Sequence, residues 1–211
     1  MESMLRWRPE AARFRHRDSL LEKSLPGADL ALEACALVDL SVAEALAWAR
    51  QAGRAPACGA GCAACCCQPI PLTPLEALLL ARYAHLRLRP EERAALALPP
   101  LRRNCPLLLD GRCTAYVVRP LACRRYLVLD RSCAPGEDAA SSRPADLLLP
   151  DPGLLAAALL RTLPWYVRRP GCPLPPRSSD PAAARRFFRS VTTVIQALPW
   201  GKELAQEDGV A

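Results

Sequence analysis

Cysteine is concentrated in two stretches of the chain, and the first is the denser. Five thiols fall within ten residues there, at Cys58, Cys62, Cys65, Cys66 and Cys67. A buried cysteine packs like any small apolar side chain, so packing alone does not account for five of them together. Clustered thiols instead indicate chemistry: a metal site, an iron–sulfur cluster or a disulfide.

The spacing within this stretch suits metal ligation. Cys58, Cys62 and Cys65 have the spacing C-x3-C-x2-C, and the last two continue with Cys66 as C-x2-C-C. Thiolates two or three residues apart can converge on one metal because a tight turn brings the chain back, and the intervening glycines supply the dihedral angles for such a turn. Adjacent side chains point apart, so Cys65 and Cys66 could serve two metal atoms, or a metal and a redox role. Cys67 lies outside both spacings.

The second stretch holds four cysteines at longer spacing: Cys105, Cys113, Cys123 and Cys133. Histidine occurs only as His16 and His85, and we interpret His85 as a surface residue. A ligand set made of sulfur favours zinc or an iron–sulfur cluster over magnesium, calcium or a mononuclear oxygenase iron.

A β-hairpin around an Asp-Gly pair is predicted to bring two of these cysteines together. A two-residue turn would place Cys105 and Cys113 on opposite faces of the hairpin. A three-residue loop, Leu109–Gly111, would pair Leu108 with Arg112 and place both cysteines on one face. If both bind metal, we predict the three-residue loop.

The residues around Cys123 also suggest a role at the site. Arg119-Pro120 predicts an extended step that turns Cys123 back toward the hairpin. Arg124 and Arg125 would lower the pKa of the neighbouring thiol and offset the charge of a thiolate site. The alternative for these two arginines is an ordinary solvated face.

The composition favours a protein with a sizeable core in a reducing compartment. The chain has 211 residues and a hydrophobic fraction of 51%, which suits one domain or two small ones without disulfide staples. Its charged N-terminus has no secretory signal, and its longest apolar run, about seven residues, is far short of the roughly 20 needed to span a bilayer. We therefore expect a cytoplasmic protein with no membrane partner, in which thiols stay reduced. Eleven cysteines also cannot all pair within one chain.

The net charge of +7 comes mostly from arginine. A nucleic-acid face is one interpretation, since basic and aromatic residues alternate over 6–17. We favour the other interpretation, a composition rich in Arg and Ala, and do not expect nucleic acid as a partner.

The pattern of caps and apolar positions predicts a mainly α fold. We expect a small helical domain with one short β-hairpin, organised around a cysteine-liganded metal site. Helices are predicted over about 28–38, from Ser41 to a stop at Gly53, from Thr73, from Pro90 to Pro99-Pro100, from Asp151 and from Asp180. We divide the chain into a helical N-terminal extension (1–55), a cysteine-cluster metal-binding domain (56–135), and a Pro-rich connection with C-terminal helices packing on it (136–211).

Two motifs in order carry a resemblance to a known family. The run CGAGCAACCCQPIPLTPLEA, followed by CPLLLDGRCTAYVVRPLACRRYLVLDRSC, resembles the YkgJ-like cysteine-cluster family, described as a zinc- or iron-chelating domain and named for its CxxCxxCC motif. The resemblance covers roughly 58–133. It implies eight metal ligands: Cys58, Cys62, Cys65, Cys66, Cys105, Cys113, Cys123 and Cys133. It also implies supporting roles for Tyr116, Arg119, Pro120 and Arg124.

The chain departs from the family pattern at the extra thiol of Cys67, which leaves the ligand choice in that run open. Cys35 and Cys172 each stand alone, and we interpret both as structural. The family also includes flagellin lysine N-methylases, which are similar in this cysteine region and imply an iron–sulfur site with S-adenosylmethionine as methyl donor. Those chains are longer, and we find no glycine-rich nucleotide loop here.

Three functions therefore compete. The first is a metal-binding protein that chelates zinc or iron, where we favour an iron–sulfur cluster such as 4Fe-4S because the C-x3-C-x2-C spacing resembles a three-thiolate cradle. The second is an iron–sulfur-dependent methyltransferase-like enzyme, or a radical S-adenosylmethionine enzyme, acting on a protein. The third is a thiol redox or metal-delivery protein. The sequence leaves open whether there is catalysis, and allows a protein partner or substrate.

Overall fold

The computed structural model describes residues 16–59, 61–98, 104–167, 169, 171–176, 180–202 and 204. It confirms a mainly α fold with short β elements. The basic and aromatic segment before His16 and the predicted Pro99-Pro100 stop lie outside the described residues. The α-helices are α1 (Ser19–Ser24), α2 (Ala28–Gln51), α3 (Pro74–Arg87), α4 (Pro90–Ala97), α5 (Leu121–Arg125), α6 (Ala139–Ser142), α7 (Pro152–Val167) and α8 (Pro181–Val191). The 3-10 turns are η3 (Ala64–Cys67), η4 (Tyr116–Val118), η5 (Pro144–Asp146) and η6 (Ile195–Ala197).

Helix α2 is the longest element, and it corrects one sequence prediction. The two predicted helices, 28–38 and the one capped by Ser41, are a single helix of 24 residues. Ser41 does not cap a new helix, because its buried hydroxyl donates to the carbonyl oxygen of Asp151 at 3.3 Å. A serine inside a helix is tolerated when its side chain finds a partner elsewhere. The predicted stop is confirmed, since α2 ends at Gln51 and Gly53 has a φ of 75°.

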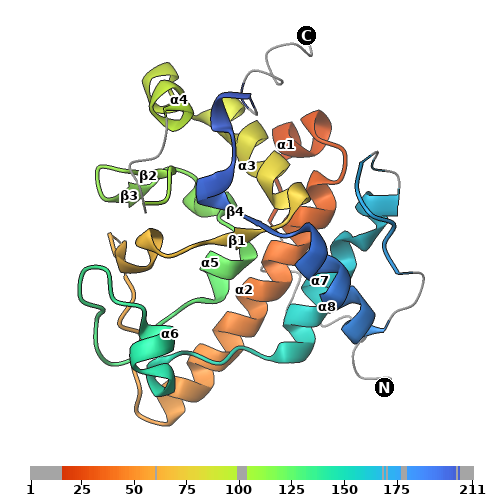
Figure 1. The fold of residues 1–211 in the computed structure, drawn as a ribbon. Coiled ribbons are helices and arrows are strands. Elements are labelled where there is room, and N and C mark those ends of the chain that lie inside the picture. Colours follow the sequence, from red (N-terminus) through yellow and green to blue (C-terminus); the bar gives the residue numbers. More distant parts are fainter. Residues whose placement is uncertain are drawn as a thin grey trace.

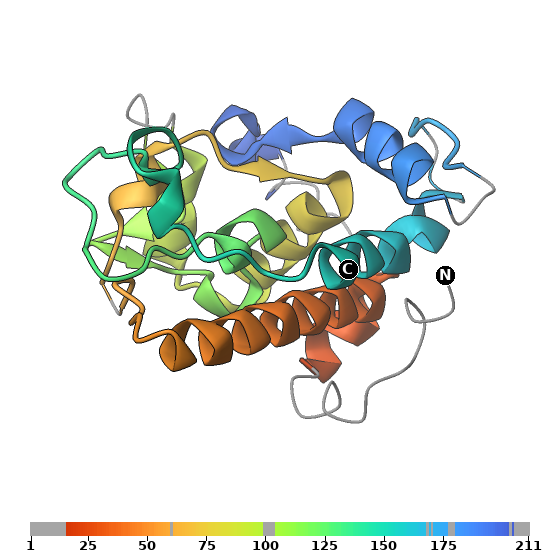
Figure 2. The same ribbon diagram turned by 90° about the horizontal axis from the view of Figure 1, so that it is seen from below.

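Helices α2, α7 and α8 form one side of the molecule. Helix α7 lies along α2, and α8 lies on the other side of α7 (Figures 1 and 2). The α2–α7 contact is apolar, with Ala34, Val38 and Ala158 fully buried in it. Small residues at such a contact let the two helix backbones approach closely.

The remaining predicted helix starts are confirmed by their caps. Thr73 and Glu76 form a complete capping box at the start of α3. Asp180 accepts hydrogen bonds from the first turn of α8, and Asp151 accepts one from the Leu154 amide at 2.8 Å in α7. Helix α4 begins at Pro90, as predicted, and ends at Ala97.

Two short antiparallel strand pairs complete the described fold. The predicted hairpin consists of β2 (Leu108–Leu109) and β3 (Arg112–Cys113). The second pair, β1 (Pro71–Leu72) with β4 (Thr193–Val194), was not predicted, since two-residue strands carry no alternation signal. This pair attaches the end of the chain to the segment that follows the first cysteine stretch.

One apolar core contains residues from Leu21 to Leu204. All three predicted segments therefore contribute to it. The division at 55 and 135 stays a prediction. In the part of the chain that the structure describes, no helix has the length and apolar character needed to cross a membrane.

Gly27, just before α2, gives a first test of this packing. Replacing it with alanine is expected to lower the free energy of unfolding by about 2 kcal/mol. The loss is expected because alanine is strained in a left-handed backbone conformation and because its Cβ would overpack the site. Its φ is 89°, and an added Cβ would collide with the Trp165 ring, whose Nε1 donates to the Pro26 carbonyl at 3.0 Å. Urea denaturation measures the loss. Gly53→Ala is the matched control, because its φ is 75° and nothing lies within 4 Å of an added Cβ. Equal losses would contradict the collision.

Candidate metal centre

The two cysteine stretches meet through a backbone hydrogen bond. The amide of Cys105 donates to the carbonyl oxygen of Cys66 at 2.7 Å. Cys65 and Cys66 belong to η3, which lies between the β2–β3 hairpin and α6 in Figure 1. Cys105 is 6% exposed and belongs to the core. Cysteines about 40 residues apart in sequence therefore lie against each other at the edge of the core.

The hairpin turn differs from the prediction. Leu109 pairs with Arg112, so the loop is the two-residue turn Asp110-Gly111, with φ values of 48° and 73°. The predicted three-residue loop is wrong. The physical reason is local: aspartate tolerates a left-handed backbone, and an Asp-Gly pair is the common sequence of a two-residue hairpin turn.

The two hairpin cysteines are nevertheless neighbours. Cys105 precedes the paired strand and lies in a turn. A hydrogen bond of 3.0 Å from the Leu108 amide to the Cys105 carbonyl oxygen closes this turn. Strand alternation therefore does not extend to it, and the predicted separation by faces does not apply. Cys113 pairs across the hairpin with Leu108, and the Leu108 amide donates to the Cys105 carbonyl oxygen.

Cys123 reaches the same region from α5. Arg119 has φ −54° and ψ 147°, which confirms the predicted extended step before Pro120. The Cys123 side chain is partly buried against the core, and its pKa is raised by burial and, to a smaller extent, by the nearby Cys105, Cys65 and Cys113. We call these four, Cys65, Cys105, Cys113 and Cys123, the inner thiols.

The inner thiols are held in their neutral form unless a cation is near. Burial raises the pKa of Cys105 to about 11 and that of Cys123 to about 12. Burial also raises the pKa of Cys113. A hydrogen bond with Cys66, with burial adding to it, raises the pKa of Cys65. A metal ion would reverse this preference, because it binds the thiolate and releases the proton.

Three other thiols, Cys58, Cys62 and Cys133, lie nearer the surface, and we call them the outer thiols. Cys62 is exposed and the other two are half-buried. The sulfur of Cys58 accepts a hydrogen bond from the Val128 amide at 3.3 Å. Burial raises the pKa of Cys58 and that of Cys133, and the nearby Cys62 adds to both increases. The position of Cys58 is set because residues 55–57 run beside 128–130 through backbone hydrogen bonds.

An arginine that sequence reasoning missed contacts the thiol of Cys133. Arg143 donates from Nη2 to the sulfur of Cys133 at 3.5 Å, and its side chain is only 8% exposed. Glu137 and Asp146 hold its guanidinium at 2.8 and 2.7 Å. Hydrogen bonds from Arg143 lower the pKa of Glu137 to about 2. No spacing rule signals such a network, since its members come from a loop without periodicity.

The expected role of the two arginines beside Cys123 is wrong for Arg124. Its guanidinium is 1% exposed and pairs with Asp39 at 2.7 Å, so it is neither a solvated face nor a partner of the Cys123 thiol. The pKa of Cys123 is raised by burial rather than lowered. Arg125 is exposed. The signal for the real partner was an acidic residue, Asp39, within an otherwise apolar helical stretch.

The remaining cysteines have separate environments. Cys67 donates to the carbonyl oxygen of Ala64 at 2.9 Å, within its own turn. Cys35 is 3% exposed inside α2, as predicted for a structural residue, and burial raises its pKa to about 11. Cys172 is half-buried against the core. All eleven cysteines fall in the described part of the chain and are free thiols.

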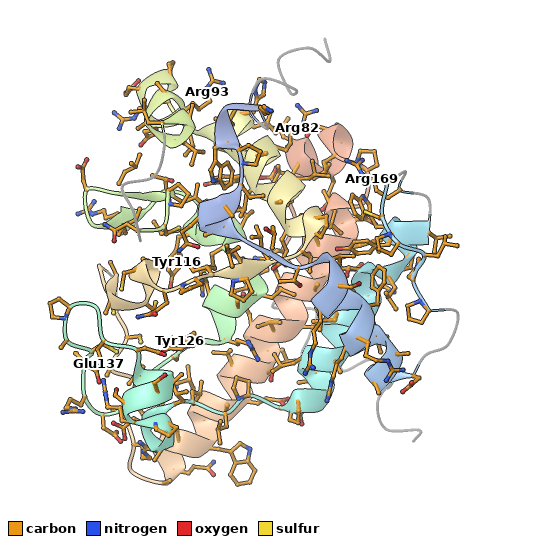
Figure 3. The ribbon with its side chains drawn as sticks, in the orientation of Figure 1. Arg82, Arg93, Tyr116, Tyr126, Glu137 and Arg169 are labelled. Atoms are coloured by element: carbon orange, nitrogen blue, oxygen red, sulfur yellow. The ribbon has the colours of Figure 1, made fainter. Side chains whose placement is uncertain are left out.

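Tyr116 marks the surface beside the inner thiols. Its ring is exposed, and the Arg119 guanidinium lies 4.0 Å from the ring centroid. Figure 3 shows Tyr116, Tyr126 and Glu137 on the side of the molecule that carries the hairpin and α6, far from Arg169. Because Arg119 stacks on Tyr116, its charge stays close to Cys113. Burial raises the pKa of Cys113, and the charge of Arg119 offsets part of that increase.

The chemistry of this region fits a thiolate-preferring metal. Within the described ranges, no group of three or more His, Cys, Asp or Glu side chains is placed to hold one metal ion as the side chains stand. The donors that do gather are thiols from three segments, which suit zinc or iron and do not suit magnesium or calcium. The region is therefore rich in donors of the kind that zinc and iron prefer.

Comparison with known families agrees with this chemistry. Residues 57–139 match the family model CxxCxxCC, described as "Putative zinc- or iron-chelating domain". This segment of the chain is similar to the CxxCxxCC domain, and the predicted resemblance to the cysteine-cluster family is confirmed. No curated protein and no solved structure matched the chain.

Proposed function

We propose that this protein binds zinc or iron through the thiolates of Cys58, Cys62, Cys65, Cys66, Cys105, Cys113, Cys123 and Cys133. The observation that carries the proposal is the convergence of the two cysteine stretches, tied by the bond between Cys105 and Cys66 at 2.7 Å. The matched domain, 57–139, contains all eight residues. Buried thiols with raised pKa values gain most from a bound cation, since metal binding offsets the cost of ionising them.

We propose further that iron is held as an iron–sulfur cluster. Support comes from the C-x3-C-x2-C spacing of Cys58, Cys62 and Cys65 and from the partial burial of the inner thiols. Such a cluster would supply one-electron chemistry or an open iron. The residues of this chain would hold the thiolates, exclude water from the inner thiols, and donate a hydrogen bond from Arg143 to the Cys133 sulfur.

The test is purification without oxygen, followed by measurement of metal, sulfide and the visible spectrum. We expect zinc or iron at no less than about one equivalent per chain, and brown absorption with acid-labile sulfide if the metal is iron. A colourless zinc protein would contradict the cluster and leave metal chelation standing. A chain that holds neither metal, even after incubation with zinc or with iron and sulfide, would overturn both.

A serine variant of Cys105 is the informative comparison for this measurement. It removes an inner thiol, and we expect metal content to fall, because four-coordinate sites rarely tolerate loss of a ligand. Cys35→Ser is a poor control because that residue is buried, whereas Cys172→Ser is a fair one and should keep the metal of the unchanged protein. The methyltransferase-like interpretation stays a prediction, which calorimetry with S-adenosylmethionine on the metal-loaded protein tests.

A further inference from the structure

The segment that joins the first cysteine stretch to α3 is poor in backbone hydrogen-bond donors. Residues 68–71 read Gln-Pro-Ile-Pro, and a proline has no backbone N–H group. Between the two prolines only Ile70 can donate from the backbone, so a regular strand ladder cannot cover this segment. The ladder between β1 and β4 accordingly covers two residue pairs. The backbone groups at 68 and 70 therefore need other partners.

The side chain of Gln196 supplies these partners. Its Oε1 accepts a hydrogen bond from the Ile70 amide at 3.2 Å, and its Nε2 donates to the Gln68 carbonyl oxygen at 2.7 Å. One carboxamide thus pairs with a backbone donor and a backbone acceptor, as a residue of a neighbouring strand would. Gln196 belongs to η6, which follows β4 directly, and β4 lies beside β1 (Figure 1).

Gln68 connects this contact to the turn that carries the thiols. Its amide donates to the Cys65 carbonyl oxygen at 3.1 Å and closes η3. Its side chain donates to the Gly136 carbonyl oxygen at 3.4 Å, in the loop after the last cysteine of the second stretch. The Cys105 amide donates to the Cys66 carbonyl oxygen at 2.7 Å. The turn and Gln68 are therefore tied to three segments: the one before the hairpin, the loop at Gly136, and η6.

Of these three segments, η6 alone lies beyond the matched residues 57–139. It is fixed to the core, because Ile195 is fully buried and its amide donates to the Ile70 carbonyl oxygen at 2.9 Å. The indole of the buried Trp200 donates to the Ile195 carbonyl oxygen at 3.2 Å. The carboxamide of Gln196 is thus presented from a packed element, and such an element positions its partners more precisely than a free loop does.

We propose that Gln196 is a positioning residue for the thiols of η3, which are those of Cys65, Cys66 and Cys67. It acts through the backbone of Gln68 and fixes the turn relative to the core. Without it the Ile70 amide and the Gln68 carbonyl oxygen would lose a partner. This inference rests on the proposed function, because it treats Cys65 and Cys66 as ligands, and it deepens that function by adding a residue from outside the matched segment.

The first test is the rate at which iodoacetamide alkylates each thiol of the reduced, metal-free chain, followed by mass spectrometry. Gln196→Leu keeps much of the side-chain volume and removes both hydrogen bonds. We expect alkylation of Cys66 and Cys67 to become about tenfold faster, the scale for easier local opening of a turn that has lost such bonds. Gln196→Glu keeps an acceptor for the Ile70 amide and should show a smaller increase. Circular dichroism checks that each variant keeps its helices.

Two thiols of the same chain serve as internal controls. Cys35 is 3% exposed inside α2 and reports global unfolding, whereas Cys62 is exposed and reports the reagent itself. Neither rate should change in Gln196→Leu. Gln51→Leu is the matched control, because Gln51 is exposed at the end of α2 and its replacement should leave every rate unchanged. Unchanged rates at Cys66 and Cys67 in Gln196→Leu would overturn the proposal. An equal increase at Cys35 would also overturn it, because Gln196 would then support the whole fold.

Zinc affinity gives the second readout and separates this inference from the proposed function. The unchanged protein and its variants are loaded with zinc chloride without oxygen, and zinc is then competed away with a chromophoric chelator. We expect Gln196→Leu to bind zinc about tenfold more weakly, the usual scale for the loss of a group that supports a ligand, and Gln51→Leu to bind it as the unchanged protein does. Equal affinities in Gln196→Leu and the unchanged protein overturn the role of Gln196 toward the metal. If no protein in the series takes up zinc or iron, the proposed function fails, while faster alkylation at Cys66 and Cys67 still supports the positioning of the turn.

Discussion

Replacing Arg124 with methionine is expected to lower the free energy of unfolding by about 4 kcal/mol, the scale for breaking a buried ion pair. Its guanidinium is 1% exposed and donates to Asp39 at 2.7 Å, to the Arg119 carbonyl at 3.0 Å and to the Val117 carbonyl. Methionine keeps much of the side-chain volume, so the loss reports the bonds rather than a cavity. The carboxylate of Asp39 and two carbonyl groups would be left without this donor.

Urea denaturation of the metal-free protein, under reducing conditions, measures the effect. Arg125→Met is the matched control, because that neighbour is exposed and its replacement should change stability by less than about 0.5 kcal/mol. A double-mutant cycle with Asp39→Asn isolates the pair, and we expect a coupling of more than about 1 kcal/mol. If Arg124→Met costs no more than Arg125→Met, the buried pair does not support the fold.

This pair connects parts of the chain that the family match separates. Asp39 belongs to α2, before the matched residues 57–139, and Arg124 follows Cys123 within them. Burial opposes ionisation of Asp39, but a hydrogen bond with His16 and the charge of Arg124 outweigh it and lower its pKa. The two carbonyl groups that Arg124 holds lie between Cys113 and Cys123. Helix α2 therefore helps to shape the loop that carries two of the inner thiols.

Local signals account for the elements that the sequence predicted correctly. The starts of α3, α7 and α8 depend on a cap and a proline within four residues, and these act whatever the tertiary context. The continuity of α2 could not be predicted in this way. Ser41 reads as a cap until its partner is known, and that partner, Asp151, lies 110 residues away.

The same distinction between local sequence signals and distant partners applies to the candidate site. Cysteine content and spacing identified the thiols and their family, because few other roles demand thiols at such spacing. The charged residues around them were missed or assigned the wrong partner. Arg143 finds Cys133, and Arg124 finds Asp39, only through the path of the folded chain. The hairpin register shows a third case: the turn followed its local preference, and a turn at Cys105, outside the strand, placed the thiol.

Replacing Glu76 with alanine is the second large effect, an expected loss of about 3 kcal/mol from hydrogen-bond donors left unsatisfied in a partly buried site. The carboxylate accepts from the Thr73 amide at 2.7 Å and from the Thr73 hydroxyl at 2.8 Å, which closes the capping box of α3. Its other oxygen accepts from the Leu121 amide at 2.8 Å, at the first residue of α5. One carboxylate therefore holds the start of α3 and the start of the helix that carries Cys123.

Glu92 provides the control for the local part of this effect. It closes a similar box at the start of α4, where it accepts from the Arg89 amide at 2.9 Å in an exposed position. Glu92→Ala should therefore cost much less than Glu76→Ala in urea denaturation. The excess measures the bond to Leu121. Equal losses from the two variants would contradict a link between α3 and α5.

The pH dependence of the stability lost in Glu76→Ala gives an independent check on the same carboxylate. Burial raises the pKa of Glu76 above 4.5, against the hydrogen bonds from Thr73 and Leu121 and the charge of Arg124, which lower it. A folded pKa above the unfolded one means that the folded state favours the protonated acid. The stability from this preference is fully present below 4.5 and is lost as the pH rises through the folded pKa. The gap in stability between the unchanged protein and Glu76→Ala should therefore narrow between about pH 4 and about pH 7. A gap that widens over this range would mean that the hydrogen bonds outweigh burial, and that Glu76 holds α5 as a stabilised anion.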